Sequence, residues 1–123
     1  MKKKLTAEQI VALHIASDEL CDIADLTGDY RTHNREFKKK LKLFDILKDD
    51  IELAKVVYDG LLEYDNITTK TSAAASCLKL GIYVNRAEQT LEEISRRNDI
   101  GIRRGNAEMT LMVWRGDVPG KTL

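Results

Sequence analysis

Apolar residues along this chain recur at intervals of three and four positions, which is the spacing that places them on one face of an α-helix. The alternation of apolar and polar residues that marks a half-buried strand is missing from the sequence. The single proline is Pro119, so the strongest helix breaker interrupts the chain only near its end. The pattern predicts an all-α protein of about six helices arranged in three hairpins.

Capping residues predict where the first three helices begin and end. Thr6 and Gln9 match a capping box, and Thr27-Gly28-Asp29 stops the first helix. Asp29 is expected to cap the second helix, and Asp49-Asp50 to open a third that continues through Gly60 to about residue 64. The predicted inner faces are Ile10, Leu13, Ala16, Leu20, Ile23 and Ala24 in the first helix, Tyr30, Asn34, Phe37, Leu41, Phe44 and Leu47 in the second, and Ile51, Ala54, Val57, Tyr58, Leu61 and Leu62 in the third.

The second half of the chain predicts three further helices. A turn over residues 65–69 leads into a helix rich in small side chains, which suits a central position among other helices and which Gly81 stops. Asn85 is expected to cap a fifth helix with Ala87, Leu91 and Ile94 inward, and residues 98–105 form a loop. A short sixth helix ends at Gly116, and its apolar residues are Ala107, Met109, Leu111, Met112 and Trp114. Residues 1–116 are therefore one helical-repeat domain, followed by a flexible tail at 117–123.

Composition supports a globular chain and narrows its partners. The 123 residues are 43% hydrophobic and 33% charged, with 20 basic and 20 acidic side chains. A neutral chain is not a general binder of polyanions. The charge is nevertheless segregated, because residues 29–48 hold seven bases and three acids while residues 49–65 hold one base and six acids. We interpret this alternation as complementarity between neighbouring solvated helix faces.

The sequence predicts a cytoplasmic protein. No apolar run approaches the roughly 18 residues of a membrane helix, and the lysines at the start do not lead into a signal-peptide core. Cys21 and Cys77 form no CxxC pair and lie among apolar residues, so both are expected to be small buried hydrophobes without a disulfide.

Five segments of the chain carry a resemblance to a known family. They are residues 34–37 (Asn-Arg-Glu-Phe), residues 61–65 (Leu-Leu-Glu-Tyr-Asp), residues 71–78 (Thr-Ser-Ala-Ala-Ala-Ser-Cys-Leu), residues 87–94 (Ala-Glu-Gln-Thr-Leu-Glu-Glu-Ile) and residues 107–116 (Ala-Glu-Met-Thr-Leu-Met-Val-Trp-Arg-Gly). Their order resembles an uncharacterised bacterial family, the domain of unknown function numbered two thousand and nineteen. The resemblance implies a HEAT- or armadillo-like α-α superhelix and no activity, since fold analogy warrants no chemistry. The residues expected to be structural are Asn34, Phe37, Leu62, Asp65, Ala74, Leu91, Leu111 and Trp114.

Candidate catalytic and metal-binding groups are few. His14, Asp18 and Asp22 share one helix face and could hold a metal, but the favoured interpretation is a solvated face with a His–Asp pair. Cys21 or Ser17 beside His14 would need an orienting group and an oxyanion donor that no motif supplies. Residues 98–105 contain two glycines and two arginines but lack the lysine and strand of a phosphate loop. We therefore expect no enzyme activity, no metal and no cofactor.

Two surfaces are candidates for binding macromolecules. A basic row on the second helix could grip phosphates, although no exposed aromatics for base stacking are evident; it comprises Arg31, Arg35, Lys38, Lys39 and Lys42. Trp114 and its methionine neighbours could form a partner-binding patch, but a core position is favoured for a lone Trp in a terminal helix. The leading hypothesis is a non-enzymatic protein–protein interaction module, one version of which neutralises a toxin as immunity proteins do. The alternative is a helical domain that binds nucleic acid weakly through the basic row.

Overall fold

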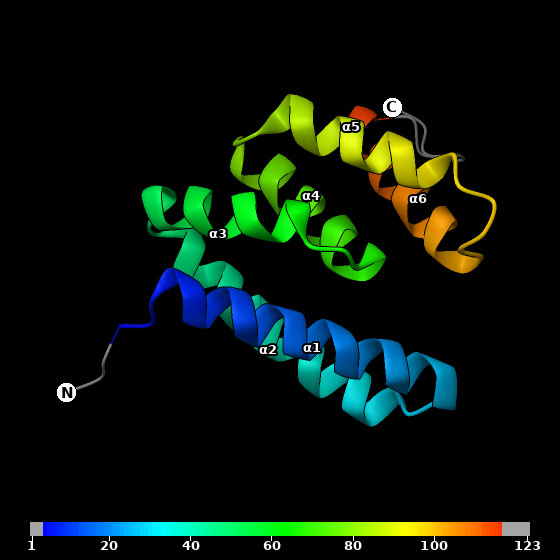
Figure 1. Ribbon diagram of the computed structural model, residues 1–123, viewed down its shortest axis with the longest axis horizontal. Coiled ribbons are helices and arrows are strands. Elements are labelled where there is room, and N and C mark those ends of the chain that lie inside the picture. Colours follow the sequence, from blue (N-terminus) through cyan, green and yellow to red (C-terminus); the bar gives the residue numbers. More distant parts are fainter. Residues whose placement is uncertain (1–3, 117–123) are drawn as a thin grey trace. The chain divides into compact units, whose positions relative to one another are not determined.

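Six helices account for the described part of the chain, as the apolar pattern predicts. The computed structural model describes residues 4–116, apart from the side chain of Ile102, and this range contains no strand (Figure 1). The predicted tail at 117–123 lies outside the described residues. The helices are α1 (Ala7–Thr27), α2 (Tyr30–Lys48), α3 (Ile51–Glu63), α4 (Ile67–Leu80), α5 (Val84–Ser95) and α6 (Ile102–Arg115).

The helices group into two compact units, Met1–Tyr64 and Asp65–Leu123. In the first unit α1 and α2 lie side by side as an antiparallel hairpin, and α3 packs against α1 (Figure 1). In the second unit α5 packs against both α4 and α6. The single domain of residues 1–116 stays a prediction of the sequence.

Most of the predicted helix ends are confirmed by their hydrogen bonds. The Gln9 amide donates to Thr6 Oγ1 (3.2 Å) and the Thr6 amide donates to Gln9 Oε1 (2.9 Å), which completes the capping box. Asp29 and Asp50 cap α2 and α3 by accepting backbone amides three residues on. α3 runs through Gly60, where an added Cβ would lie 3.9 Å from Val11 Cγ2 of α1.

Three helix starts in the second unit differ from the prediction. Asn66 caps α4 by accepting the Thr69 amide (3.1 Å), so the predicted turn over 65–69 is too long. Asn85 is not a cap, because α5 begins before it and its N-cap position is held by Tyr83 in a left-handed conformation (φ 47°). α6 takes in much of the predicted loop at 98–105, since it starts at Ile102 and accommodates Gly105 within a helical turn.

The first two helices bury a face that the apolar pattern does not predict. α1 turns His14, Ser17 and Asp18 inward with Ile10, Cys21 and Ala24, while Leu13, Leu20 and Ile23 stay exposed. α2 buries Glu36, Leu43 and Leu47 and leaves its predicted inward residues Tyr30, Phe37 and Leu41 exposed. Ser17 and Asp18 are inside because they bond Glu36 and Lys40 across the α1–α2 interface, and His14 bonds Asp18 within α1, so their burial leaves no lone charge.

The remaining helices pack largely as predicted. Ala54, Val57, Tyr58, Leu61 and Leu62 of α3, and Ala87, Leu91 and Ile94 of α5, are all buried. Of the residues expected to be structural, those that lie in the core are Leu62, Ala74, Leu91 and Leu111. The others lie at the surface: Asn34, Phe37, Asp65 and Trp114. The inward position expected of Asn34, Phe37 and Trp114 is therefore wrong, while the structural role of Asp65 in the turn stays a prediction.

Two glycines predict opposite effects of the same substitution. Gly105→Ala should raise the free energy of unfolding by about 0.5–1 kcal/mol, because Gly105 lies inside α6 with nothing within 4 Å of the added Cβ. Gly81→Ala should lower it by about 1 kcal/mol, because Gly81 ends α4 with φ at 72°. Urea unfolding of the two variants measures both; equal changes of one sign would contradict the assigned helix ends.

Candidate functional site

A buried ionic cluster centred on Asp18 joins α1 to α2. Asp18 is fully buried, His14 Nδ1 lies 2.8 Å from its Oδ2, and Lys40 Nζ of α2 donates to its Oδ1 over 2.8 Å. The prediction that the His–Asp pair lies on a solvated face is wrong, because this face of α1 is the one that meets α2. The carboxylate carries one bond from each helix and therefore fixes their register.

A second carboxylate, Glu36 of α2, forms the neighbouring contact. Its Oε1 accepts a hydrogen bond from Ser17 of α1 (3.1 Å), and its Oε2 lies 3.1 Å from Arg35 Nε and 3.0 Å from Lys39 Nζ. Glu36 is buried while both cations remain largely exposed. Two positive charges share one negative charge here, so the cluster stays net positive.

The partners of both carboxylates stabilise their ionised forms. Burial by itself would raise the pKa of Asp18, but the hydrogen bond and charge of His14, together with Lys40, outweigh it and lower that pKa below its ordinary value. Burial acts in the same way on Glu36, and the bonds from Lys39, Arg35 and Ser17 lower its pKa. Both groups are therefore carboxylates whenever the folded protein is near neutral pH.

Of the candidate metal and nucleophile residues, His14, Ser17 and Asp18 are engaged in these structural contacts. No group of three or more His, Cys, Asp or Glu side chains in residues 4–116 comes together in a way that could hold a metal ion. Ser17 donates to Glu36 rather than to His14. Cys21 and Cys77 are free and buried as predicted, and burial raises the pKa of both thiols, that of Cys77 to about 12. Neither thiol is a ready thiolate nucleophile at neutral pH.

Arg97, between α5 and α6, and Arg104, in the first turn of α6, are both engaged locally. Arg97 donates to Asp99 through two nitrogens, at 3.0 and 2.7 Å. Arg104 donates to Asn98 Oδ1 (2.9 Å) and lies 3.2 Å from Glu108. Of residues 98–105, only 98–101 lie between the two helices, because α6 begins at Ile102, so the interpretation of this stretch as an inter-helix turn holds for its first half alone.

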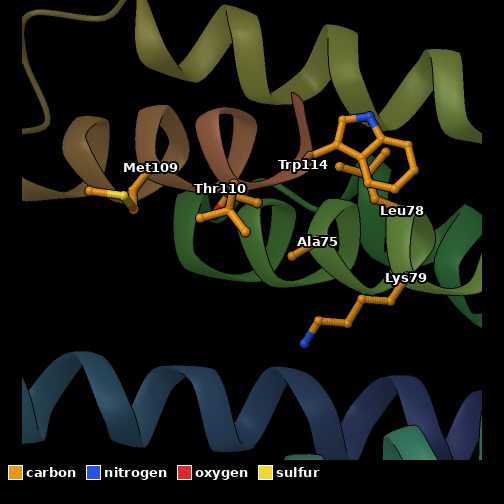
Figure 2. Close-up of a pocket in the computed structure, with 7 residues that line it drawn as sticks. Ala75, Leu78, Lys79, Met109, Thr110 and Trp114 are labelled. Carbon is orange, nitrogen blue, oxygen red and sulfur yellow. The ribbon is translucent and has the colours of Figure 1, made fainter. Parts of the chain in front are cut away.

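An apolar groove lies between α4 and α6 in the second unit. α6 is oriented by its buried Ala107 and Leu111 and by Arg115, which bonds Glu88 (3.2 Å) and Glu92 of α5. This orientation leaves Met109, Val113 and Trp114 on the side next to α4. The groove has a volume of about 290 Å³, and its lining residues are Ala75, Leu78, Lys79, Met109, Thr110, Val113 and Trp114 (Figure 2).

Trp114 is a wall of this groove and not a core residue as the sequence favoured. It keeps 44% of its surface exposed, because Leu111 rather than Trp114 occupies the inward position of α6. Its indole lies beside Leu78 in Figure 2, while Thr110 faces the small side chain of Ala75. Ala73 and Ala74 of α4 are fully buried, as expected of small residues in a central helix, whereas Ala75 lines the open hollow.

The groove continues along the same two helices into a polar section. A hollow of about 230 Å³ shares Ala75 and Thr110 with the apolar groove, and its other lining residues are Ile67, Thr68, Thr71, Ser72, Arg103 and Asn106. The surface between α4 and α6 is therefore apolar at the Trp114 end and polar at the other. No motif in the sequence predicts this change from an apolar to a polar section, because it arises from the pairing of α4 with α6.

The five predicted basic residues are brought together on α2. Arg31, Arg35, Lys38, Lys39 and Lys42 line one hollow of about 490 Å³ with Asn34. Tyr30 and Phe37 of the same helix are exposed, so aromatic side chains do accompany the basic row, contrary to the sequence-based expectation.

Comparison of the chain with protein-family models, with curated proteins and with solved structures finds no match. None of the helices in residues 4–116 is long and apolar enough to span a membrane. The function must therefore be argued from the surfaces themselves.

Removal of the central carboxylate should strongly destabilise the first unit. Asp18→Ala leaves Lys40 and His14 without their buried partner, so the free energy of unfolding should fall by about 3–5 kcal/mol. Asp45→Ala is the control, because Asp45 is an exposed carboxylate of α2 and its loss should change stability by less than about 0.5 kcal/mol. Urea unfolding measures both, and similar losses in the two variants would contradict the buried pair.

Acid should remove the same stabilisation. Because the folded pKa values of Asp18 and Glu36 are lowered, their contribution is fully present above the unfolded values and is lost as pH falls through the folded ones. The difference in unfolding free energy between the wild type and Asp18→Ala should therefore shrink below about pH 4. Urea titrations at decreasing pH measure this difference; a constant gap would contradict the lowered pKa of Asp18.

Proposed function

We propose that the chain is a non-enzymatic, cytoplasmic protein-interaction module of the helical-repeat class, and that it binds a partner protein in the groove between α4 and α6. The single observation that carries the proposal is the exposure of Trp114, Met109 and Val113 around one apolar hollow. Trp and Met are enriched in protein interfaces, and binding energy concentrates where an aromatic residue borders a pocket.

The groove best fits an amphipathic helix of the partner. An apolar side chain of that helix would enter beside Trp114 and Leu78, where Ala75 leaves room. One or two turns further on, polar side chains would meet the section lined by Thr71, Ser72 and Asn106. The methionine at the rim can adjust its rotamer to the shape of the entering side chain.

The chemistry of the interior supports binding rather than catalysis. His14, Ser17 and Asp18, the residues from which a catalytic site was conceivable, are engaged in holding α1 to α2. The thiols of Cys21 and Cys77 have raised pKa values and are buried. The apolar groove itself carries Lys79 as its one ionisable lining residue, and a single such group makes no acid–base pair.

Nucleic-acid binding through α2 is the second candidate. The observation in its favour is that the five cations line one hollow while Tyr30 and Phe37 of the same helix are exposed for stacking. Against it, Arg35 and Lys39 share the Glu36 carboxylate, and the following helix is acidic. The anisotropy of labelled single-stranded DNA at low salt decides: no change with micromolar protein ends this candidate.

A matched pair of variants tests the groove. Val113→Glu places a charge in the apolar section, whereas Val56→Glu places the same charge on α3; the two valines are 60% and 61% exposed. Affinity capture with the full chain should recover a protein with the wild type and with Val56→Glu but lose it with Val113→Glu. Both variants should melt like the wild type, because neither valine is in the core.

The fluorescence of Trp114, the only tryptophan of the sequence, measures partner binding in the groove directly. Binding of the recovered protein should shift the Trp114 emission to shorter wavelength and protect it from acrylamide, since the indole passes from partial exposure into an interface. Capture that is equal for both glutamate variants, or a partner that leaves this emission unchanged, would refute the groove as the binding site.

A further inference from the structure

An uncharged apolar row runs along the outside of α1. Leu13, Ala16, Leu20 and Ile23 follow one another at intervals of three, four and three residues and are all exposed, with Ile23 at 57%. The row spans about 15 Å, or nearly three helical turns. It is exposed because the opposite, polar side of α1 faces α2, so the buried ionic cluster and the exposed row have one cause.

Cations of α2 border this row on one side. Ser17 lies four residues after Leu13 and three before Leu20, so on the helix surface it adjoins both. Ser17 bonds the same Glu36 carboxylate that holds Arg35 and Lys39, which brings those two cations to the edge of the row. Lys42 follows Lys39 by three residues and lines the same hollow.

The positive charge of the α2 residues that border the row indicates what kind of molecule covers it. Glu36 neutralises one of its two neighbouring cations, so the border of Arg35, Lys39 and Lys42 keeps a net positive charge next to an apolar strip that contains no acid. A second copy of the chain, packed face to face with its α1 antiparallel, would bring these cations against one another. Helices that lie in a membrane surface are rich in Lys and Arg on their own polar face, whereas α1 contains neither residue.

We propose that the α1 row with its basic border, the residues Leu13, Ala16, Leu20, Ile23, Arg35, Lys39 and Lys42, binds an amphipathic helix of a partner protein whose apolar stripe is edged with Asp or Glu. The apolar stripe covers the row, and the acidic edge pairs with the cations of α2 and fixes the direction of the bound helix. This surface belongs to the first unit, whereas the groove between α4 and α6 belongs to the second.

Two synthetic helical peptides of about 20 residues test the proposal on the full chain. Both carry the same leucine stripe, one edged with Glu and the other with Lys. In ¹⁵N-labelled protein the Glu peptide should shift the amides of residues 13–23 and 35–42, bind about tenfold more tightly than the Lys peptide, and lose this preference at high salt. Equal affinity of the two peptides, or shifts only in residues 65–116, would overturn the proposal.

Variants separate the row from its border. Ile23→Glu should weaken the Glu peptide at least about tenfold, whereas Val56→Glu on α3 should not. Lys42→Glu should weaken the Glu peptide about fivefold and leave the Lys peptide no weaker, while Lys55→Glu, with the same change of net charge, should have no effect. Circular dichroism checks that each variant is folded.

Binding to anionic vesicles or to single-stranded DNA that exceeds binding to the Glu peptide, or concentration-dependent dimerisation through the row, would also overturn the proposal.

Discussion

The structure of the first unit depends on the charged contact between Asp18 of α1 and Lys40 of α2. A buried ion pair is stable only when both charges keep their partners, so this contact permits one rotation of each helix about its axis. That rotation turns the polar side of α1 inward with His14 and Ser17, and it leaves Leu13, Leu20 and Ile23 outside. The interior contact and the apolar surface are therefore two results of a single choice of helix face.

The second unit obeys the ordinary rule that apolar side chains go inward. α5 packs against α6, and Ala87, Leu91, Ala107 and Leu111 of these two helices are buried. Arg115 at the end of α6 bonds Glu88 and Glu92 of α5. In this unit the exposed apolar residues Met109, Val113 and Trp114 lie on the side of α6 that lines the groove beside α4. The chain thus presents apolar surface for two different reasons, a reversed helix face in one unit and a groove between helices in the other.

Helices and caps could be predicted from the sequence because they depend on residues three and four apart. Thr6, Asp29, Asp50, Gly81 and Gly116 act at the ends where local rules place them. The starts of α5 and α6 could not, since one is held by Tyr83 in a strained left-handed conformation and the other lacks a side-chain cap. The face that α1 buries could not be predicted either, because Ser17 and Asp18 gain their partners Glu36 and Lys40 from 19 and 22 positions away. The groove at Trp114 requires the pairing of α4 with α6, which no local spacing encodes.

The ionic contact between α1 and α2 also bears on how this sequence can change over time. In most helical proteins the apolar positions stay alike among relatives, and the charged ones drift. Here positions 18 and 40 can change only together, and so can positions 17 and 36, because a single replacement leaves a buried polar group without its partner. In related proteins, the buried polar residues of α1 and α2 should therefore be substituted in pairs. The exposed Leu13 and Leu20 should vary independently of them, according to what binds the outer surface of α1.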